Sequence, residues 1–76
     1  MDDVVKSIAE LIEEVADIPK ERISGESLIV DDLNLSSLQI VIALAELERK
    51  FSIRISESEL GKIRTVNDLA EMIKNS

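Results

Sequence analysis

Two adjacent serines, Ser36 and Ser37, stand where a long polar loop meets the most apolar helical pattern of the chain. Ser36 and Gln39 have the spacing of a capping box. In that motif a serine side chain accepts a hydrogen bond from the amide three residues on, and the glutamine reaches back to the cap amide. The pattern predicts Ser36 as the N-cap and Ser37 as the first helical residue. A hydroxyl there lies beside backbone N–H groups that have no partner within the helix.

An anion attached to Ser37 would gain about 0.3–1 kcal/mol from these donors and from the helix dipole. The position therefore suits a phosphodiester, and we interpret Ser37 as a candidate attachment point for a prosthetic group. Capping serines are common, however. From spacing alone the plainer interpretation, that the two serines only begin a helix, is the more frequent one.

The composition excludes several kinds of catalytic and metal-binding site. The chain has 76 residues, enough for one small domain, which we expect to span residues 1–76. It has no Cys and no His, which excludes thiol nucleophiles, disulfides, thiolate or imidazole metal sites and histidine acid–base catalysis. Carboxylates are plentiful, but nothing pairs them with a nucleophile, so we do not expect an enzyme. Asp31 and Asp32 resemble half of a calcium loop that lacks the other ligands and the glycine, so no metal site is predicted.

The net charge of −7 makes nucleic acid a poor partner and a basic protein surface a better one. Solubility alone also accounts for a charge of this size. No signal peptide is visible, and the longest apolar run, residues 40–45, is far too short to span a bilayer. We expect a cytoplasmic monomer without a membrane span.

Apolar residues recur at helical spacing in three long segments. The first helix is predicted over residues 3–16, with Asp2 or Asp3 as its cap and Pro19 soon after its end. Its expected apolar stripe consists of Val4, Ile8, Leu11 and Val15, widened by Val5 and Ile12.

The second helix is predicted over residues 37–51 and carries two apolar stripes. We expect the first stripe to form the core: Ile40, Val41, Leu44, Leu47 and Phe51. Part of the adjacent stripe should then be exposed and could form a docking surface: Leu38, Ile42 and Ala45. A wide buried face is the alternative for these three residues.

The remaining segments are a long loop and two further helices. Residues 17–35 form the loop, with a turn at Ser24 and Gly25 and with these apolar anchors: Ile23, Leu28, Ile29, Leu33 and Leu35. A capping box from Ser56 to Glu59 predicts a short helix that ends at Gly61. Thr65, with Asp68 three residues on, begins the last helix, whose apolar face is Val66, Leu69, Ala70 and Ile73. The sequence predicts an all-α bundle of three major helices and one short helix, with a long loop between the first two.

The order and spacing of these residues resemble the acyl carrier protein family over nearly the whole chain. The strongest part is the run Ile29-Val30-Asp31-Asp32-Leu33-Asn34-Leu35-Ser36-Ser37-Leu38, followed by Val41, Ala43, Leu44, Leu47, Glu48 and Phe51. The segments 53–55 and 63–69 are similar to the family's closing segments. The resemblance implies that a separate transferase moves 4′-phosphopantetheine from coenzyme A to Ser37, and that the thiol of the arm carries acyl groups as thioesters. Ser37, not Ser36, is the expected site, because of these two serines only Ser37 is followed directly by Leu.

The resemblance also implies two surfaces. An acyl chain is expected to shelter among Ile29, Ile40, Ala43, Leu47, Ile55, Leu60 and Ile63, although an ordinary packed core is equally consistent with these residues. Acyl-transferring or acyl-modifying enzymes and the phosphopantetheinyl transferase are the expected partners. Their expected contacts are Leu38, Gln39, Ile42, Ala45 and Glu48.

The chain departs from the family pattern near the candidate site. Ser36 replaces the usual Asp, Asn34 replaces the usual Gly, and three positions that are often acidic hold other residues: Gln39, Ile42 and Arg49. Residues 1–35 contain ten acids and three bases, and residues 36–76 contain six of each. We hypothesise that the partner surface is more apolar than in a housekeeping fatty-acid carrier, as in a specialised fatty-acid, lipid or polyketide-type pathway.

Two other functions stay open at this point. The chain could carry aminoacyl or peptidyl cargo. It could also be an unmodified acidic helical adaptor that only binds protein, and Ser36 in place of Asp is the best support for that interpretation.

Overall fold

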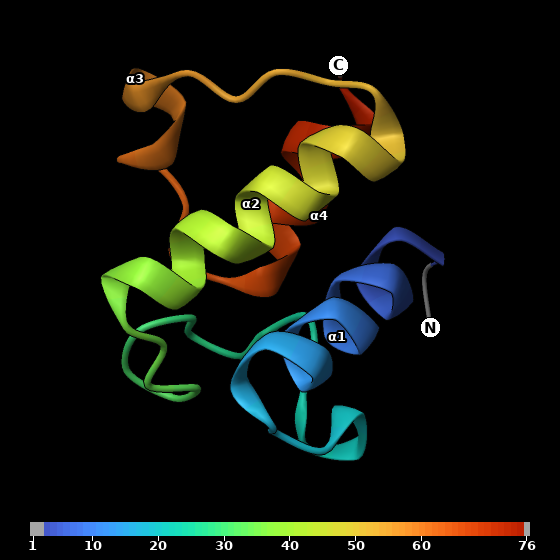
Figure 1. Ribbon diagram of the computed structural model, residues 1–76, viewed down its shortest axis with the longest axis vertical. Coiled ribbons are helices and arrows are strands. Elements are labelled where there is room, and N and C mark those ends of the chain that lie inside the picture. Colours follow the sequence, from blue (N-terminus) through green and yellow to red (C-terminus); the bar gives the residue numbers. More distant parts are fainter. Residues whose placement is uncertain (1–2, 76) are drawn as a thin grey trace.

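The computed structural model describes residues 3–75 as four α-helices and one 3-10 turn joined by loops (Figure 1). The helices are α1 (Asp3–Ala16), α2 (Ser37–Phe51), α3 (Glu57–Leu60) and α4 (Val66–Lys74), and the 3-10 turn spans Lys20–Arg22. The predicted all-α class, with three major helices and one short helix, is confirmed. The 3-10 turn was not predicted, and the suggested cap Asp2 lies outside the described residues. Within residues 3–75, no helix has the length and hydropathy needed to cross a membrane.

The first long helix, α1, packs against both α2 and α4. Its buried face is centred elsewhere than predicted: Val4, Leu11 and Val15 are only half-buried. The buried residues of α1 are Val5, Ile8, Ala9 and Ile12. The predicted face of α4 is confirmed, since all four of its apolar residues are buried. A broad apolar stripe identifies α1 as amphipathic but does not fix its rotation, which depends on contacts with two other helices.

The core stripe of α2 also needed correction. Leu44 and Leu47 are buried and Ile40 and Phe51 are half-buried, as expected for this stripe. Val41, in contrast, is 61% exposed, so its assignment to the core was wrong. Val41 lies at the edge of the stripe, on the same flank of the helix as Ser37 four residues earlier. The second stripe is exposed as expected at all three of its positions.

Each helix after the long loop begins with a capping box. Ser36 with Gln39, Ser56 with Glu59 and Thr65 with Asp68 make both reciprocal hydrogen bonds of the motif, which confirms all three predicted helix starts. The short helix ends at Gly61, as predicted, with a right-handed backbone there. The partners in each box are three residues apart, so these helix starts are determined locally.

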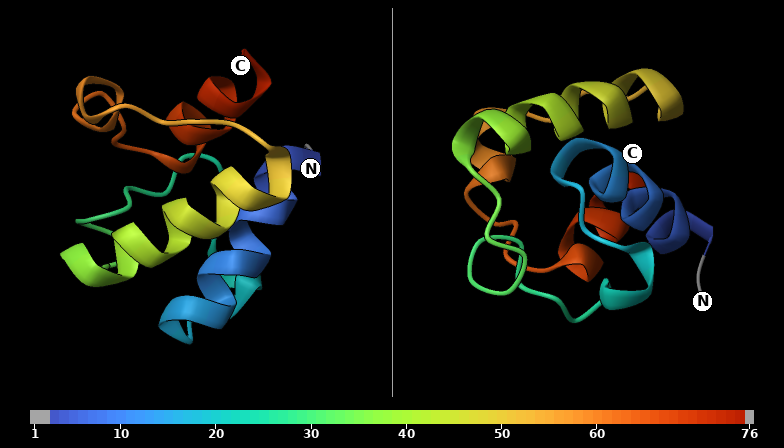
Figure 2. Two further views of the ribbon diagram at one scale, coloured as in Figure 1. Left: turned by 45° about the horizontal axis from the view of Figure 1, so that its top comes forward. Right: turned by 60° about the horizontal axis from the view of Figure 1, so that its bottom comes forward.

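The long loop between α1 and α2 is fastened to the start of α4 (Figure 2). The N–H of Asn67 donates to the Gly25 carbonyl at 2.8 Å, and the N–H of Ile29 donates to the Arg64 carbonyl at 2.9 Å. Four of the five predicted loop anchors are buried, and the fifth, Leu28, is half-buried. The loop therefore forms an ordered wall of the bundle, even though it has little regular secondary structure.

The capping box of α4 predicts a pH dependence of stability. The backbone amides of Thr65 and Arg64 each donate to Asp68 Oδ2 at 3.0 Å, and they lower the pKa of Asp68 below its ordinary value of 3.8. This pKa is lower in the folded chain than in the unfolded chain. The Asp68 carboxylate therefore stabilises the fold at pH values above 3.8, and this contribution is lost as the pH falls through the folded-state pKa.

We expect Asp68→Asn to be less stable than the parent chain at neutral pH and to lose less stability on acidification. Urea unfolding at pH 7 and near pH 3 measures both effects. Asp31→Asn, at an exposed loop aspartate, is the matched control and should leave the parent's midpoints nearly unchanged. An equal loss of stability on acidification in the parent and Asp68→Asn would contradict this account.

Candidate functional site

Ser37 is the first residue of α2, and its side chain is exposed. Ser36 Oγ accepts a hydrogen bond from the Gln39 amide at 3.1 Å, and Gln39 Oε1 accepts one from the Ser36 amide at 2.9 Å. The amides of Ser37 and Leu38 lie in the first turn, where an α-helix offers them no carbonyl. The structure thus confirms the predicted position: an exposed hydroxyl at a helix N-terminus beside two amides that can face an anion.

The residues that replace the family's usual Asp and Gly have clear structural roles. Ser36 adopts the extended backbone of an N-cap, a position at which Ser and Asp are about equally favourable. Asn34 has a φ of 54°, in the left-handed region that Gly tolerates best and that Asn also adopts. Both replacements therefore keep the local backbone that presents Ser37.

The left-handed backbone at Asn34 gives a direct test of this interpretation. Asn34→Val should lower the free energy of unfolding by about 1–2 kcal/mol, because a β-branched side chain is strained at positive φ. Asn34→Gly should be close to neutral. Urea unfolding of the two variants checks the prediction, and equal stability of Asn34→Val and the parent would contradict it.

A cavity of about 240 Å³ lies between the four helices and the long loop. Every residue that lines it is aliphatic: Ile8, Ile12, Ile29, Val30, Leu35, Ile40, Val41, Ala43, Leu44, Leu47, Leu60, Ile63 and Leu69. Six of the seven residues expected to shelter an acyl chain are among them: Ile29, Ile40, Ala43, Leu47, Leu60 and Ile63. Ile55 is not part of this lining. The residue sits in the connector after α2, where its amide donates to Glu48.

The cavity opens close to Ser37. Three of its lining residues, Val30, Val41 and Leu60, are also large exposed hydrophobic residues, which places them at the mouth. Val41 is four residues after Ser37, and one turn of helix separates the two by about 6 Å along the axis. The sequence reasoning missed Val41 as a lining residue, although its spacing of four from Ser37 was a usable signal.

The five expected partner contacts divide into two groups. Leu38, Ile42 and Ala45 lie on the outside of α2, with Leu38 68% exposed and Ile42 43% exposed. Gln39 and Glu48 are half-buried and already bonded within the chain. Glu48 Oε2 accepts the Ile55 amide at 2.7 Å and so holds the connector against α2.

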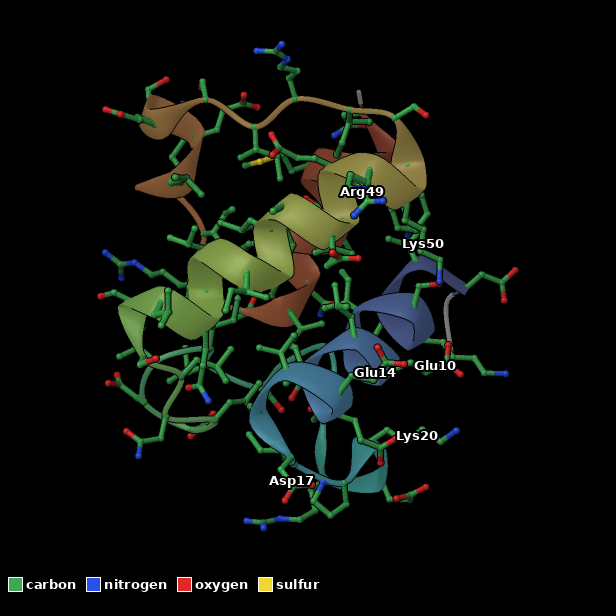
Figure 3. All side chains as sticks on the ribbon, in the orientation of Figure 1. Glu10, Glu14, Asp17, Lys20, Arg49 and Lys50 are labelled. Carbon is green, nitrogen blue, oxygen red and sulfur yellow. The ribbon has the colours of Figure 1, made fainter. Side chains whose placement is uncertain are left out.

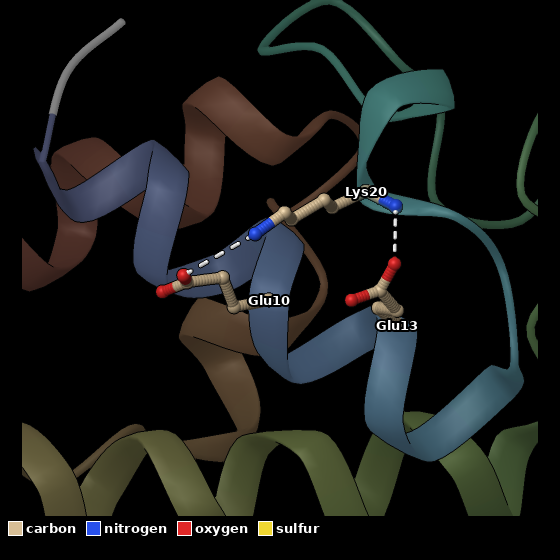
Figure 4. A network of polar contacts seen from close by, with 3 residues as sticks. All are labelled: Glu10, Glu13 and Lys20. Carbon is tan, nitrogen blue, oxygen red and sulfur yellow. Dashed lines mark hydrogen bonds and ion pairs between the residues drawn. The ribbon is translucent and has the colours of Figure 1, made fainter.

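Figure 3 labels the acidic Glu10 and Glu14 on α1 and the basic Arg49 and Lys50 near the C-terminal end of α2. Glu10, Glu14 and Lys50 border one shallow groove between these helices. Lys20 fastens the loop to α1: its amide donates to Glu13 Oε2 at 2.9 Å, and its Nζ lies 3.9 Å from Glu10 Oε2 (Figure 4). Within the part of the chain that the structure describes, no cluster of three or more carboxylates could hold a metal ion.

Residues 6–73 match the family described as "phosphopantetheine attachment site". The chain is 35% identical to an acyl carrier protein of Acidothermus cellulolyticus over 99% of this chain and 89% of that protein. It is 31% identical to an acyl carrier protein of Thermobifida fusca over 95% of this chain and 91% of that protein. It is 36% identical to a "meromycolate extension acyl carrier protein" of Mycobacterium tuberculosis over 96% of this chain but only 64% of that protein. The chain belongs to the acyl carrier protein family, whose members are carriers and not enzymes.

Membership in this family implies a covalent 4′-phosphopantetheine, a phosphopantetheinyl transferase that attaches it, and acyl-handling enzymes as partners. The described residues fit the group: a solvent-facing hydroxyl, two amides in the first turn of α2 and an aliphatic cavity within reach. When attached, the group supplies a terminal thiol that holds acyl groups as thioesters.

Proposed function

We propose that Ser37 is the residue that carries the phosphopantetheine. One observation supports this more than any other: the exposed Ser37 hydroxyl begins α2, one turn before Val41 at the mouth of the aliphatic cavity. The amides of Ser37 and Leu38 in the first turn of α2 would stabilise the negative charge of a phosphodiester on Ser37. The chain thereby provides the attachment point, the electrostatic support and an apolar shelter in one place.

The shelter is the cavity between the helices, and it suits an acyl cargo. A dry cavity of about 150 Å³ lined by aliphatic and aromatic side chains is able to hold benzene, so this cavity of about 240 Å³ has room for part of a hydrocarbon chain. All of its lining side chains are aliphatic, which favours a hydrocarbon chain over an aminoacyl or peptidyl group. Of the residues predicted for this role, we retain the six that line the cavity and omit Ile55.

Partner enzymes are proposed to contact the outside of α2 beside Ser37. Leu38, Ile42 and Ala45 are accessible for such contacts, whereas the polar groups of Gln39 and Glu48 already have partners within the chain. We assign Gln39 to the cap of α2 and Glu48 to the connector that follows it.

The cargo and pathway are proposed from the relatives. Some relatives are named for meromycolate extension, and the chain spans 64% to 74% of their length. We propose that this chain acts in a specialised fatty-acid or lipid pathway, as a cytoplasmic, monomeric, single domain over residues 1–76. Nucleic acid is not a proposed partner, because the net charge of −7 would be repelled by phosphates.

Incubation with a phosphopantetheinyl transferase and coenzyme A, followed by intact-mass measurement, tests the proposal. The expected result is the gain of one phosphopantetheine per chain. No gain with several different transferases would instead favour an unmodified adaptor that only binds protein. The adaptor alternative depends on the idea that Ser36 in place of Asp impairs modification of Ser37. Ser36 caps α2 with both hydrogen bonds of the capping box, and this argues against that idea.

A further inference from the structure

A second, shallower pocket adjoins the aliphatic cavity and has a different chemistry. It is lined by Leu28, Val30, Asp31, Ile63 and Arg64, and we call it the annex. Val30 and Ile63 also line the cavity, so the two spaces share a wall. To this apolar wall the annex adds two groups that the cavity lacks, the exposed carboxylate of Asp31 and the exposed guanidinium of Arg64.

The two sides of the annex come from distant parts of the chain that are joined by a backbone bond. The N–H of Ile29 donates to the Arg64 carbonyl at 2.9 Å and holds the long loop against the segment before α4. Asp31 directly follows Val30, which lies at the mouth of the cavity, and Arg64 directly follows Ile63 in the shared wall. The backbone therefore holds both charged residues at the border of the cavity.

The charged groups of the annex are not used to pair with each other or with other side chains. Within residues 3–75, no ion pair involves Arg64 or Asp31. The pKa of Asp68 is lowered chiefly by backbone hydrogen bonds from Thr65 and Arg64, and the charge of the Arg64 side chain adds the smallest effect. A guanidinium donates hydrogen bonds and a carboxylate accepts them. The annex thus offers a donor, an acceptor and an apolar wall in one place.

The length of the arm explains why a second site beside the mouth is needed. Val41 at the mouth lies only about 6 Å along the axis of α2 from Ser37. An extended phosphopantetheine is several times longer, so cargo in the cavity leaves slack in the arm outside it. This slack contains amides, a hydroxyl and a dimethyl-substituted carbon. Amides buried without partners among aliphatic side chains would cost free energy, so they need polar partners outside the cavity.

We propose that the annex binds the amide-bearing middle of the arm while an acyl chain occupies the cavity. Arg64 donates to an amide carbonyl of the arm, Asp31 accepts from an amide N–H or the hydroxyl, and the shared apolar wall contacts the dimethyl group. This proposal rests on the proposed function. Arg64 and Asp31 are positioning residues in this role. They keep the thioester at the mouth of the cavity, where attacking molecules reach it less easily.

The first test measures how accessible the thioester is. The full chain is loaded by a phosphopantetheinyl transferase with octanoyl-coenzyme A, and cleavage of the thioester by hydroxylamine is followed by intact mass. Arg64→Ala should raise the cleavage rate about threefold or more, the equivalent of one lost hydrogen bond. Arg64→Lys keeps a donor and should fall between Arg64→Ala and the parent. Asp31→Asn should raise the rate by a smaller factor than Arg64→Ala.

Lys62→Ala is the matched control, because it removes an exposed cation from the same connector but outside the annex. Its cleavage rate should stay within about twofold of the parent. Arg64→Ala keeps the backbone groups that bond to Ile29 and Asp68, so the local fold should be retained. Urea midpoints of the loaded chains establish that each variant is folded.

The second test observes the annex directly by ¹⁵N NMR. The Nε–H resonance of Arg64 should shift between the apo chain and the octanoyl-loaded chain. Loading with an acetyl group should shift it less, because a two-carbon cargo gives the arm little reason to stay at the mouth. Support for the proposal is this length-dependent shift together with faster cleavage in Arg64→Ala and a near-normal Lys62→Ala.

Two results would overturn the annex proposal while leaving the carrier function in place. One is the same cleavage rate in Arg64→Ala and Lys62→Ala, and the other is an Arg64 Nε–H resonance that loading does not move. In both cases the chain has been loaded, so attachment of the arm is not in question. A parent chain that gains no phosphopantetheine is a different outcome, because it removes the carrier function and the annex proposal with it.

Discussion

Replacing Ser37 by alanine is expected to abolish the gain of phosphopantetheine completely. The reason is chemical: the phosphodiester needs the Ser37 hydroxyl oxygen, and alanine has none. The helix start should survive the change, because the capping box uses Ser36 and Gln39 and leaves the Ser37 side chain in solvent. Intact mass after incubation with transferase and coenzyme A is the measurement, and an unchanged urea midpoint shows that the variant is folded.

The adjacent serine provides the matched control. Ser36→Ala should still gain one phosphopantetheine but should lose about 0.5–2 kcal/mol of stability, because the cap of α2 is removed. Ser36→Asp should keep both properties, since Asp is about as good an N-cap as Ser. Modification that persists in Ser37→Ala and disappears in Ser36→Ala would transfer the attachment role to Ser36 and refute our assignment.

Leu47→Ala should give the largest loss of stability among simple truncations of α2. The Leu47 side chain is 1% exposed, and removing buried methyl groups costs transfer free energy and enlarges a cavity. A loss of about 2–5 kcal/mol is expected, which is a large fraction of the stability of so small a domain. Urea unfolding monitored by far-UV circular dichroism measures it, since the chain has no Trp or Tyr to report by fluorescence.

Leu38→Ala is the control for this truncation, because it makes the same change in the same helix at a residue that is 68% exposed. Its stability should stay within about 0.5 kcal/mol of the parent. Similar losses in both variants would mean that the two faces of α2 are not buried as described.

The sequence predicted those features that depend on residues three or four positions apart. The three capping boxes determined where α2, α3 and α4 begin, and Pro19 indicated where α1 had to end. It also predicted six of the residues that line the cavity, through resemblance to a family. These features rest on local hydrogen bonds and backbone sterics, which a single sequence contains.

The sequence predicted less where the rotation of a helix, or a contact between residues distant in the chain, determines which side chains are buried. Val41 could not be separated from the core stripe of α2, because apolar residues occupy two faces of that helix. The predicted buried face of α1 was rotated away from the observed buried face for the same reason. Ile55 was expected at the cavity because it is apolar, but its place depends on the bond from its amide to Glu48, seven residues earlier. The left-handed backbone at Asn34 became visible only in the structure.

The capping box at the start of α2 has a consequence for the loading cycle of this carrier. Ser36 and Gln39 fix the beginning of the helix through bonds to each other, and none of these bonds involves a residue that lines the cavity. A change in the volume of the interior therefore need not displace the Ser37 oxygen. Incoming enzymes can meet the same stereochemistry at this atom whether the interior is empty or filled, so recognition of the carrier and storage of its cargo are separable properties of one small chain.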